Sequence, residues 1–148
     1  MLSNCKILIT GGAGFIGTRL ARLLVHDNEI VVYDILHRDA LTNTDLAKHP
    51  NLTLIKGDVL DLPKLREAMA GASHVIHMAS IAGVDTVISN PFRTMEVSIK
   101  GTFNALEAAG ELDGLERFVD FSTSEVFGRY AYRVSEGDVT ALGSVGGA

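Results

Sequence analysis

Residues 6–17 read KILITGGAGFIG, and this stretch decides the fold. Its first half is apolar and β-branched, which predicts a buried strand, and glycines follow at Gly11, Gly14 and Gly17. From Phe15 to His26, apolar residues then recur at helical spacing. A strand, a glycine-rich turn and a helix in this order are typical of a loop that binds the phosphates of a dinucleotide.

The glycines have separate tasks in such a loop. We expect Gly11 to allow the tight turn, Gly14 to let the backbone approach a pyrophosphate, and Gly17 to let the helix pack against the strand. The first helical turn, at Phe15 and Ile16, would offer backbone N–H groups and the positive end of the helix dipole to the anion. These five residues are the candidate phosphate-binding residues. A glycine-rich turn without a ligand is the alternative.

The alternation of strand and helix patterns continues along the chain. Short apolar runs predict four further strands, at 29–34, 52–56, 74–78 and 117–122. Two more helices are expected, at 62–70 and 90–110. Residues 36–50 are polar with weak periodicity, which favours a loop or a poorly ordered helix. This order predicts a doubly wound α/β domain with a parallel, Rossmann-type sheet.

Several residues mark the ends and the packing of the predicted helices. Asp61 and Asn90 are candidate N-caps, and Gly71 supplies a stop for the helix at 62–70. Gly101 lies inside the helix that follows Asn90, where a glycine costs about 1 kcal/mol relative to alanine. We therefore expect another part of the chain to approach the backbone closely at Gly101.

The composition indicates which broad classes of protein this chain can and cannot belong to. The chain has 148 residues, 47% of them hydrophobic, and a formal net charge of −5, which fits one domain with a substantial core. Its single Cys excludes an internal disulfide and favours a reducing compartment. There is no basic stripe, no signal-peptide pattern and no apolar run of ~20 residues. We expect a soluble, cytoplasmic protein whose partners are neither nucleic acid nor membrane.

Two acidic residues follow predicted strands. Asp34 ends the strand at 29–34, where a carboxylate would accept hydrogen bonds from the adenosine ribose hydroxyls. Its charge would repel a 2′-phosphate and so favours NAD over NADP, although Arg38 lies close in the sequence. Asp58 follows the strand at 52–56 and could accept a hydrogen bond from the adenine amino group. The alternative for Asp34 is a helix or turn cap, and the alternative for Asp58 is capping of the next helix.

Six motifs occur in an order that resembles one family. They are 10–17, Gly57-Asp58-Val59, His77-Met78-Ala79, Asn90-Pro91, Gly101-Thr102 and the segment STSEVFG at 122–128. Together they are similar to the extended short-chain dehydrogenase/reductases, in the NAD-dependent sugar-nucleotide epimerase and dehydratase group. The resemblance implies a tightly held NAD, oxidation of a sugar hydroxyl and later return of the hydride. It implies cofactor contacts from Val59, Ala79 and Ser98, the last standing where the family usually has Asn.

The resemblance also implies catalytic residues. Thr123 would orient the substrate hydroxyl beside a tyrosine base, and Glu125 lies at a position that dehydrating members use in acid–base chemistry. Those members carry Asp-Glu after the threonine, whereas this chain has Ser124-Glu125, which looks more like a decarboxylase or an epimerase. Epimerisation, dehydration and decarboxylation all stay open. His77 matches a family histidine, but a lone histidine ending a buried strand is more often a satisfied core residue. No metal site is expected.

The family's catalytic Tyr-x-x-x-Lys pair does not occur, since no tyrosine has a lysine four positions later. We therefore expect an NAD-binding domain at 1–128, a polar, glycine-rich tail at 129–148, and a chain cut before the catalytic helix and the substrate domain. The intact enzyme would be a homodimer acting on a sugar nucleotide, and the 148 residues alone would be inactive. A non-catalytic NAD-binding module is the competing hypothesis. The strand at 117–122 would form an exposed edge, which favours self-association.

Overall fold

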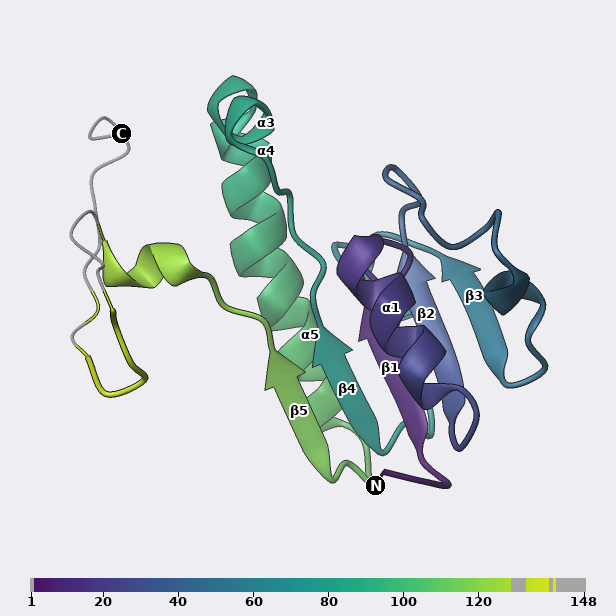
Figure 1. Cartoon of the computed structure of the whole chain (residues 1–148). Helices are drawn as coiled ribbons and strands as arrows, with labels where there is room; N and C mark the ends of the chain where they lie inside the picture. The colour runs from purple at the N-terminus through teal and green to yellow at the C-terminus, as the bar shows by residue number, and fades with distance from the viewer. Residues whose placement is uncertain (1, 129–132, 139, 141–148) are drawn as a thin grey trace.

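The computed structural model describes residues 2–128, 133–138 and 140. Within them, five strands form one sheet in the order β3-β2-β1-β4-β5, and every pairing is parallel. The strands are β1 Lys6–Thr10, β2 Glu29–Asp34, β3 Leu52–Lys56, β4 His74–His77 and β5 Arg117–Asp120. Figure 1 shows their carboxyl ends along one edge of the sheet. The predicted Rossmann-type sheet is confirmed.

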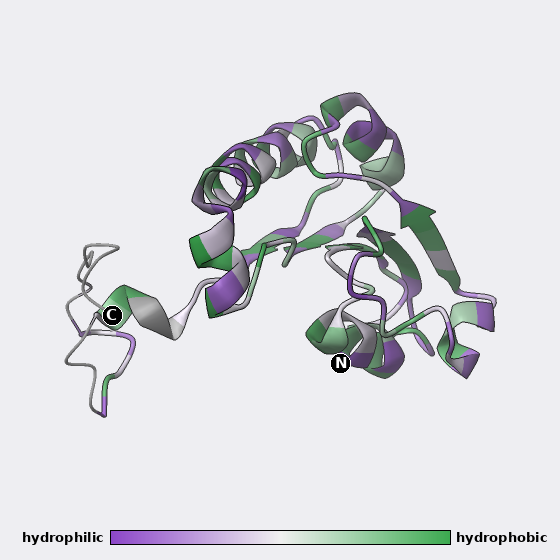
Figure 2. Ribbon diagram, turned by 90° about the horizontal axis from the view of Figure 1, so that it is seen from above, coloured by the Kyte–Doolittle hydropathy of each residue, from purple (hydrophilic) through white to green (hydrophobic). Residues whose placement is uncertain are grey.

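Helices cover both faces of this sheet. They are α1 Phe15–Leu24, α2 Leu62–Met69, α3 Val84–Ser89, α4 Pro91–Met95 and α5 Gly101–Gly110. Three shorter elements complete the described chain: the 3-10 turns η1 Asp45–Lys48 and η3 Ser124–Phe127, and the π-helical turn η2 Glu96–Lys100. Figure 2 shows α1 on one side of the sheet and the α4–α5 helix on the other. No helix among the described residues is long and apolar enough to cross a membrane.

Strand side chains alternate between two cores, one on each face. The core on the α1 face includes Ile7, Ile9, Ile30 and Val32. The core on the face of α2 and α5 includes Leu8, Val31, Tyr33 and Val75. All of these side chains are buried. Because both faces are covered, the strands appear in the sequence as nearly continuous apolar runs.

The helix predicted at 90–110 is present but irregular. The α4 and α5 segments are joined by η2, where the backbone widens into a π-helical turn. Asn90 is the N-cap of α4, as predicted, but its side chain makes no capping hydrogen bond. Instead, its carbonyl accepts from the N–H and the hydroxyl of Thr94 at 3.0 and 2.9 Å. The short helix α3, which precedes Asn90, was not predicted.

Other predicted signals are confirmed. The Asp61 carboxylate accepts a hydrogen bond from the Lys64 N–H at 3.2 Å and caps α2. Gly71 follows α2 with a φ of +74°, a left-handed conformation that suits glycine. A Cβ built on Gly101 would lie 2.6 Å from Cγ2 of Val59, which is the close approach expected there.

The polar segment after β2 is a loop with one 3-10 turn, as its weak periodicity indicated. Two of its side chains, Leu41 and Leu46, are buried in the core on the α1 face. These two anchors fix the loop on the body of the domain. The predicted tail at 129–148 falls largely on residues outside the described part, which also excludes Tyr130 and Tyr132.

Candidate functional site

The glycine-rich loop lies at the carboxyl end of β1, the central strand. Gly11 has a φ of +67°, and its N–H donates to the Tyr33 carbonyl at 2.9 Å. A Cβ on Gly11 would lie 2.9 Å from the backbone N of Ala79, in the segment that follows β4. A side chain at position 11 would therefore strain the backbone conformation and clash with the backbone of Ala79. This confirms the tight turn predicted at Gly11.

Gly17 and Gly14 differ in what surrounds them. A Cβ on Gly17 would lie 2.5 Å from Cα of Gly12 and 2.7 Å from its carbonyl oxygen, so α1 packs closely here. These atoms belong to the first two residues after β1, so Gly17 lets the helix lie close to the end of the strand. Within 4 Å, a Cβ on Gly14 would meet only the Gly11 carbonyl oxygen, at 3.2 Å. The rest of the space beside Gly14 is open.

The first turn of α1 presents backbone donors beside this open space. Gly14 is the N-cap in an extended conformation, and Thr18 N–H donates to its carbonyl at 2.9 Å. The N–H groups of Phe15, Ile16 and Gly17 precede that bond and have no partner in the helix ladder. The Phe15 side chain is 86% exposed. Loop and helix thus combine N–H groups with the positive end of the helix dipole, the features that bind an anion.

Asp34 is buried at the end of β2, next to the loop. Its Oδ2 accepts from the Ala13 N–H at 3.1 Å, and its Oδ1 accepts from the Leu36 N–H at 2.7 Å. The carboxylate therefore ties the glycine-rich loop to the turn after β2, as the capping alternative predicted. An ionised carboxylate has about four acceptor positions, so these two bonds leave room for a ligand hydroxyl.

Asp58 joins β3 to the α4 helix. Its Oδ1 accepts from the Leu60 N–H at 3.0 Å, and its Oδ2 accepts from Nη2 of Arg93 at 2.7 Å. Arg93 also donates to Glu96 at 2.8 Å, and both carboxylates, Glu96 first, raise the pKa of Arg93. The alternative, that Asp58 caps the next helix, is wrong, because Asp61 is the N-cap of α2 and Asp58 holds only the turn before it. Sequence reasoning missed Arg93 because its partner lies 35 residues away and no local pattern links the two.

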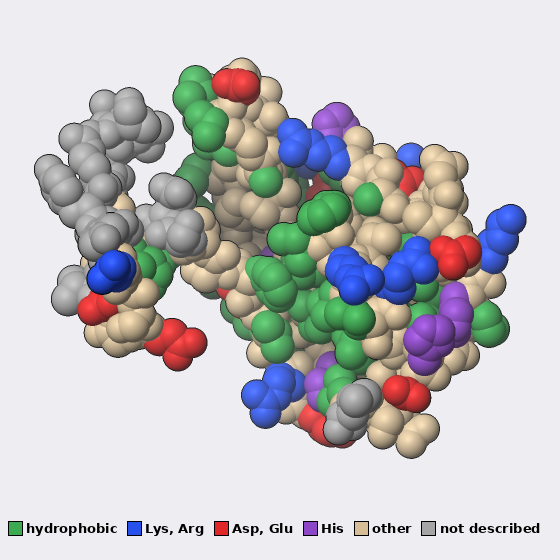
Figure 3. Space-filling model, in the orientation of Figure 1, with side chains coloured by type: hydrophobic (Ala, Val, Ile, Leu, Met, Phe, Trp, Pro, Cys, Tyr) green, Lys and Arg blue, Asp and Glu red, His purple; other side chains and the backbone are tan. Residues whose placement is uncertain are grey.

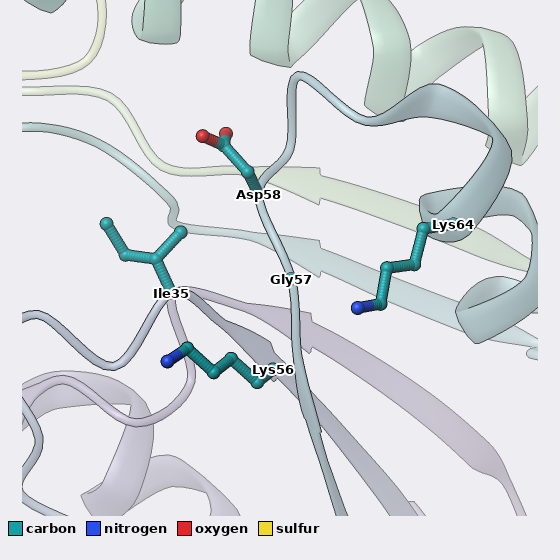
Figure 4. Close-up of a pocket in the computed structure, with 5 residues that line it drawn as sticks. All are labelled: Ile35, Lys56, Gly57, Asp58 and Lys64. Atoms are coloured by element: carbon teal, nitrogen blue, oxygen red, sulfur yellow. The ribbon is translucent and has the colours of Figure 1, made fainter.

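A cavity of about 370 Å³ lies beside Asp58, at the carboxyl ends of β2 and β3 (Figure 4). It is lined by Ile35, Lys56, Gly57, Asp58 and Lys64. In Figure 4 the side chains of Lys56 and Lys64 lie on either side of the Gly57 backbone. A Cβ on Gly57 would overlap the ring of Tyr33, so a glycine is required at this wall. Ile35 and the two lysines were not among the predicted site residues.

Val59 is buried and lies between the end of β3 and α5. Its side chain packs on Gly101, and its carbonyl accepts from Nδ2 of Asn104 at 2.9 Å. Ser98 lies in η2, where its carbonyl accepts from the Thr102 hydroxyl at 2.6 Å. Val59 and Ser98 therefore lie on the helix side of the carboxyl edge, and Ala79 lies against the glycine-rich loop at β4.

His77 ends β4 and is satisfied on both sides of its ring. Its Nδ1 lies 2.7 Å from Oγ1 of Thr10, and its Nε2 lies 3.2 Å from Oγ1 of Thr102. The Thr10 hydroxyl oxygen also accepts from the N–H groups of Met78 and Ala79, at 3.1 and 3.2 Å. The expected satisfied core histidine is confirmed at His77.

The catalytic candidates follow β5. Thr123 is exposed, and its carbonyl accepts from the Val126 N–H at 3.3 Å. The Glu125 backbone belongs to η3, whereas its side chain lies outside the described part of the structure. In the described residues, His, Cys, Asp and Glu form no group of three that could hold a metal ion.

This chain is similar in sequence and in fold to enzymes that modify sugar nucleotides. The family model of GDP-mannose 4,6-dehydratase matches residues 8–140. A UDP-N-acetyl-α-D-glucosaminuronate decarboxylase from Bacillus cytotoxicus is 33% identical over 94% of this chain and 43% of its own length. The structure of a UDP-N-acetylglucosamine 4-epimerase from Methanobrevibacter ruminantium matches with a TM-score of 0.85 and 26% identity, over 95% of this chain and 45% of that one. A dTDP-glucose 4,6-dehydratase from Streptomyces venezuelae, determined with NAD bound, matches with a TM-score of 0.77 and 30% identity, over 86% and 42%.

The sheet order and the glycine-rich loop define a Rossmann-type domain of the dinucleotide-binding class. The chain belongs to the extended short-chain dehydrogenase/reductases, in the sugar-nucleotide epimerase and dehydratase group. It spans 42–45% of the length of these three proteins.

Proposed function

We propose that this chain is the cofactor-binding part of an NAD-dependent enzyme that modifies a sugar nucleotide. The observation that carries the proposal is the glycine-rich loop, with open space beside Gly14 and the free N–H groups of the first turn of α1. The Streptomyces venezuelae dehydratase was determined with NAD bound, which supports the choice of cofactor. When bound, NAD accepts a hydride from the sugar and returns it later in the reaction.

The residues at the carboxyl edge fit the parts of NAD in order along the sheet. The pyrophosphate would lie against Gly11 and 14–17 at β1, and Asp34 at β2 would accept from the adenosine ribose. Asp58 and Val59 would contact the adenine at β3. Ala79 and Ser98 would contact the nicotinamide half, on the side of β4 and β5. This order matches the strand order, because each group follows a neighbouring strand.

Thr123 and Glu125 would act on the substrate at the nicotinamide end. A hydroxyl at Thr123 would hydrogen-bond the sugar oxygen whose charge changes during oxidation. Glu125 would act as an acid or base, and Ser124 beside it favours decarboxylation or epimerisation over dehydration. The relatives include a decarboxylase, a 4-epimerase and dehydratases, so all three reactions remain candidates.

The 148 residues by themselves would bind the dinucleotide without turning over a sugar nucleotide. They contain no tyrosine with a lysine four positions later, so the base of the family's reaction is missing from them. We also propose that the intact protein is a cytoplasmic homodimer, in line with the single Cys and with the exposed apolar side chains of the α4–α5 helix.

The same lack of a Tyr-Lys pair favours a second candidate, a non-catalytic NAD-binding module. Reading the gene beyond codon 148 separates the two. A Tyr-x-x-x-Lys pair within the next few tens of codons supports the enzyme, and an immediate stop codon supports the binding module.

Calorimetric titration of the purified chain tests the cofactor. We expect NAD to bind, ADP-ribose to bind nearly as tightly, and NADP to bind more weakly. Replacing Asp34 with Ala should weaken NAD binding and reduce the preference over NADP. Unchanged relative affinities would remove Asp34 from the site.

The variant Gly14→Ala tests the loop itself. Its methyl would meet only the Gly11 carbonyl in the protein but would occupy the space proposed for the pyrophosphate. We expect a loss of NAD affinity of at least about tenfold, with a change of less than about 1 kcal/mol in the free energy of unfolding. Gly110→Ala, in open space, is the control and should bind NAD like the wild type. Full affinity in Gly14→Ala would contradict the proposed pyrophosphate site.

A further inference from the structure

The loop after β2 is attached to the glycine-rich loop. The Ala40 N–H donates to the Ala13 carbonyl at 2.8 Å, and the buried Leu41 follows directly. Asp34, at the start of the same loop, accepts from the Ala13 N–H. These bonds at both ends place the intervening residues, including Arg38, beside the carboxyl end of β1.

Arg38 reaches from this loop to the other side of β1. A Cβ built on Gly83 would lie 3.4 Å from Nη2 and 3.8 Å from Nη1 of Arg38, so the guanidinium packs on the Gly83 backbone. Gly83 lies between β4 and α3, whereas Arg38 follows β2. Since β2 and β4 are the two neighbours of β1, the Arg38 side chain spans the end of the central strand.

The cation has no carboxylate partner in the part of the chain that the structure describes. Its neighbour Asp39 uses Oδ1 to accept from the N–H groups of Leu41 and Thr42, both at 2.9 Å. The nearest acid in sequence is therefore occupied within its own turn. Figure 3 shows cationic side chains above the hollow between the helices on the two sides of this edge.

We propose that Arg38 binds the diphosphate of the dinucleotide on the side opposite the N-terminal turn of α1. This inference rests on the proposed function, which places a pyrophosphate at the glycine-rich loop. A guanidinium donates two parallel N–H bonds to phosphate oxygens, and such charge-assisted bonds are the stronger kind. The phosphates would then be held by backbone N–H groups on one side and by Arg38 on the other.

Titration of the 148-residue chain with adenosine, AMP, ADP, NAD and NADP tests this role. Arg38→Gln should lower the affinity for ADP and for NAD by the same factor, about tenfold, and leave adenosine binding unchanged. Arg38→Lys keeps the charge but loses the paired N–H donors of the guanidinium, so its affinity for ADP and NAD should lie between those of the wild type and Arg38→Gln. The affinity of the wild type for NAD should also fall more steeply with salt than that of Arg38→Gln.

The matched control is Arg19→Gln, which removes an exposed cation of α1 that has no ion pair in the described residues. It should bind NAD like the wild type. Binding of NAD and ADP that Arg38→Gln leaves unchanged would overturn the inference, and a loss confined to NADP would assign Arg38 to a 2′-phosphate instead. A wild-type chain that binds no adenine nucleotide would overturn the proposed function as well.

Discussion

His77 shows how one side chain links the central strands to the long helix. The Thr102 hydroxyl donates to the Ser98 carbonyl, so its oxygen can accept from Nε2–H of His77. The Thr10 oxygen already accepts two backbone N–H groups, so its hydrogen is donated to Nδ1. These partners assign a neutral ring protonated at Nε2. Burial lowers the pKa of His77, and Asp120 opposes this only in part.

This buried ring makes stability depend on pH. Because the pKa of His77 is lower in the folded chain, the unfolded chain takes up a proton first as the pH falls. The contribution is present above the ordinary histidine pKa of about 6.5 and is lost as the pH falls through the folded value. We expect urea unfolding to give a larger free energy near pH 7.5 than near pH 5.5. In His77→Gln this difference should shrink.

His37→Gln is the control for this experiment, since His37 is exposed after β2. It should keep the pH dependence of the wild type. If His77→Gln kept the pH dependence of the wild type as well, another group would have to cause it. The assignment of a neutral His77 ring in the folded chain would then be contradicted.

At the scale of elements, Gly101 sets the distance between α5 and the end of β3. The Cγ2 of Val59 occupies the place that a side chain at position 101 would need. Gly110 lies in the same helix, but a Cβ there would meet nothing within 4 Å. The two glycines therefore separate the cost of a close contact from the helix propensity of glycine.

We expect Gly101→Ala to lower the free energy of unfolding by about 1–3 kcal/mol, because the added methyl overpacks the contact with Val59. Gly110→Ala should change it by less than about 1 kcal/mol, and in the stabilising direction. In a Val59→Ala background, most of the cost of Gly101→Ala should disappear. Equal costs in both backgrounds, measured by urea unfolding, would show that this contact does not limit the helix position.

The sequence predicted the elements whose signals are local. Strands buried on both faces, the cap at Asp61 and the turn at Gly11 depend on neighbours in the sequence, so they could be inferred. The π-helical turn at 96–100, the bond of Arg93 to Asp58 and the contact of Arg38 with Gly83 depend on residues brought together from distant elements. Gly101 stands between these cases: the sequence predicted a close approach there, but only the fold identifies Val59 as the partner.

At the scale of the whole molecule, apolar side chains remain exposed on the α3–α5 segment. They are Val84, Ile88, Phe92, Met95, Ile99, Phe103 and Leu106. Phe92 is 82% exposed and Phe103 67%. The outer strand β5 adds Val119 at the sheet edge, as predicted for this strand. Figure 3 also shows hydrophobic side chains over the face that carries α1.

We expect these helix side chains to drive self-association of the chain. Analytical ultracentrifugation should show a mass that rises with concentration, since many large apolar side chains exposed on one helical segment favour association. Phe103→Glu should shift the chain toward the monomer. Leu23→Glu, at a 62% exposed position on α1, is the matched control and should not. A wild-type chain that stays monomeric at high concentration would contradict this expectation.

The central position of β1 in the sheet affects how the chain folds during its synthesis. During synthesis β1 leaves the ribosome before the other four strands and can pair with β2 after one short helix. Its other edge stays open until β4 has been made, because Thr10 and His77, which are partners in the sheet, lie 67 residues apart. Loop closure over this length costs more entropy than closure of the β1–β2 unit. The strand that carries the phosphate loop is thus the earliest of the five to be made, but it is fully paired only after β4 has followed.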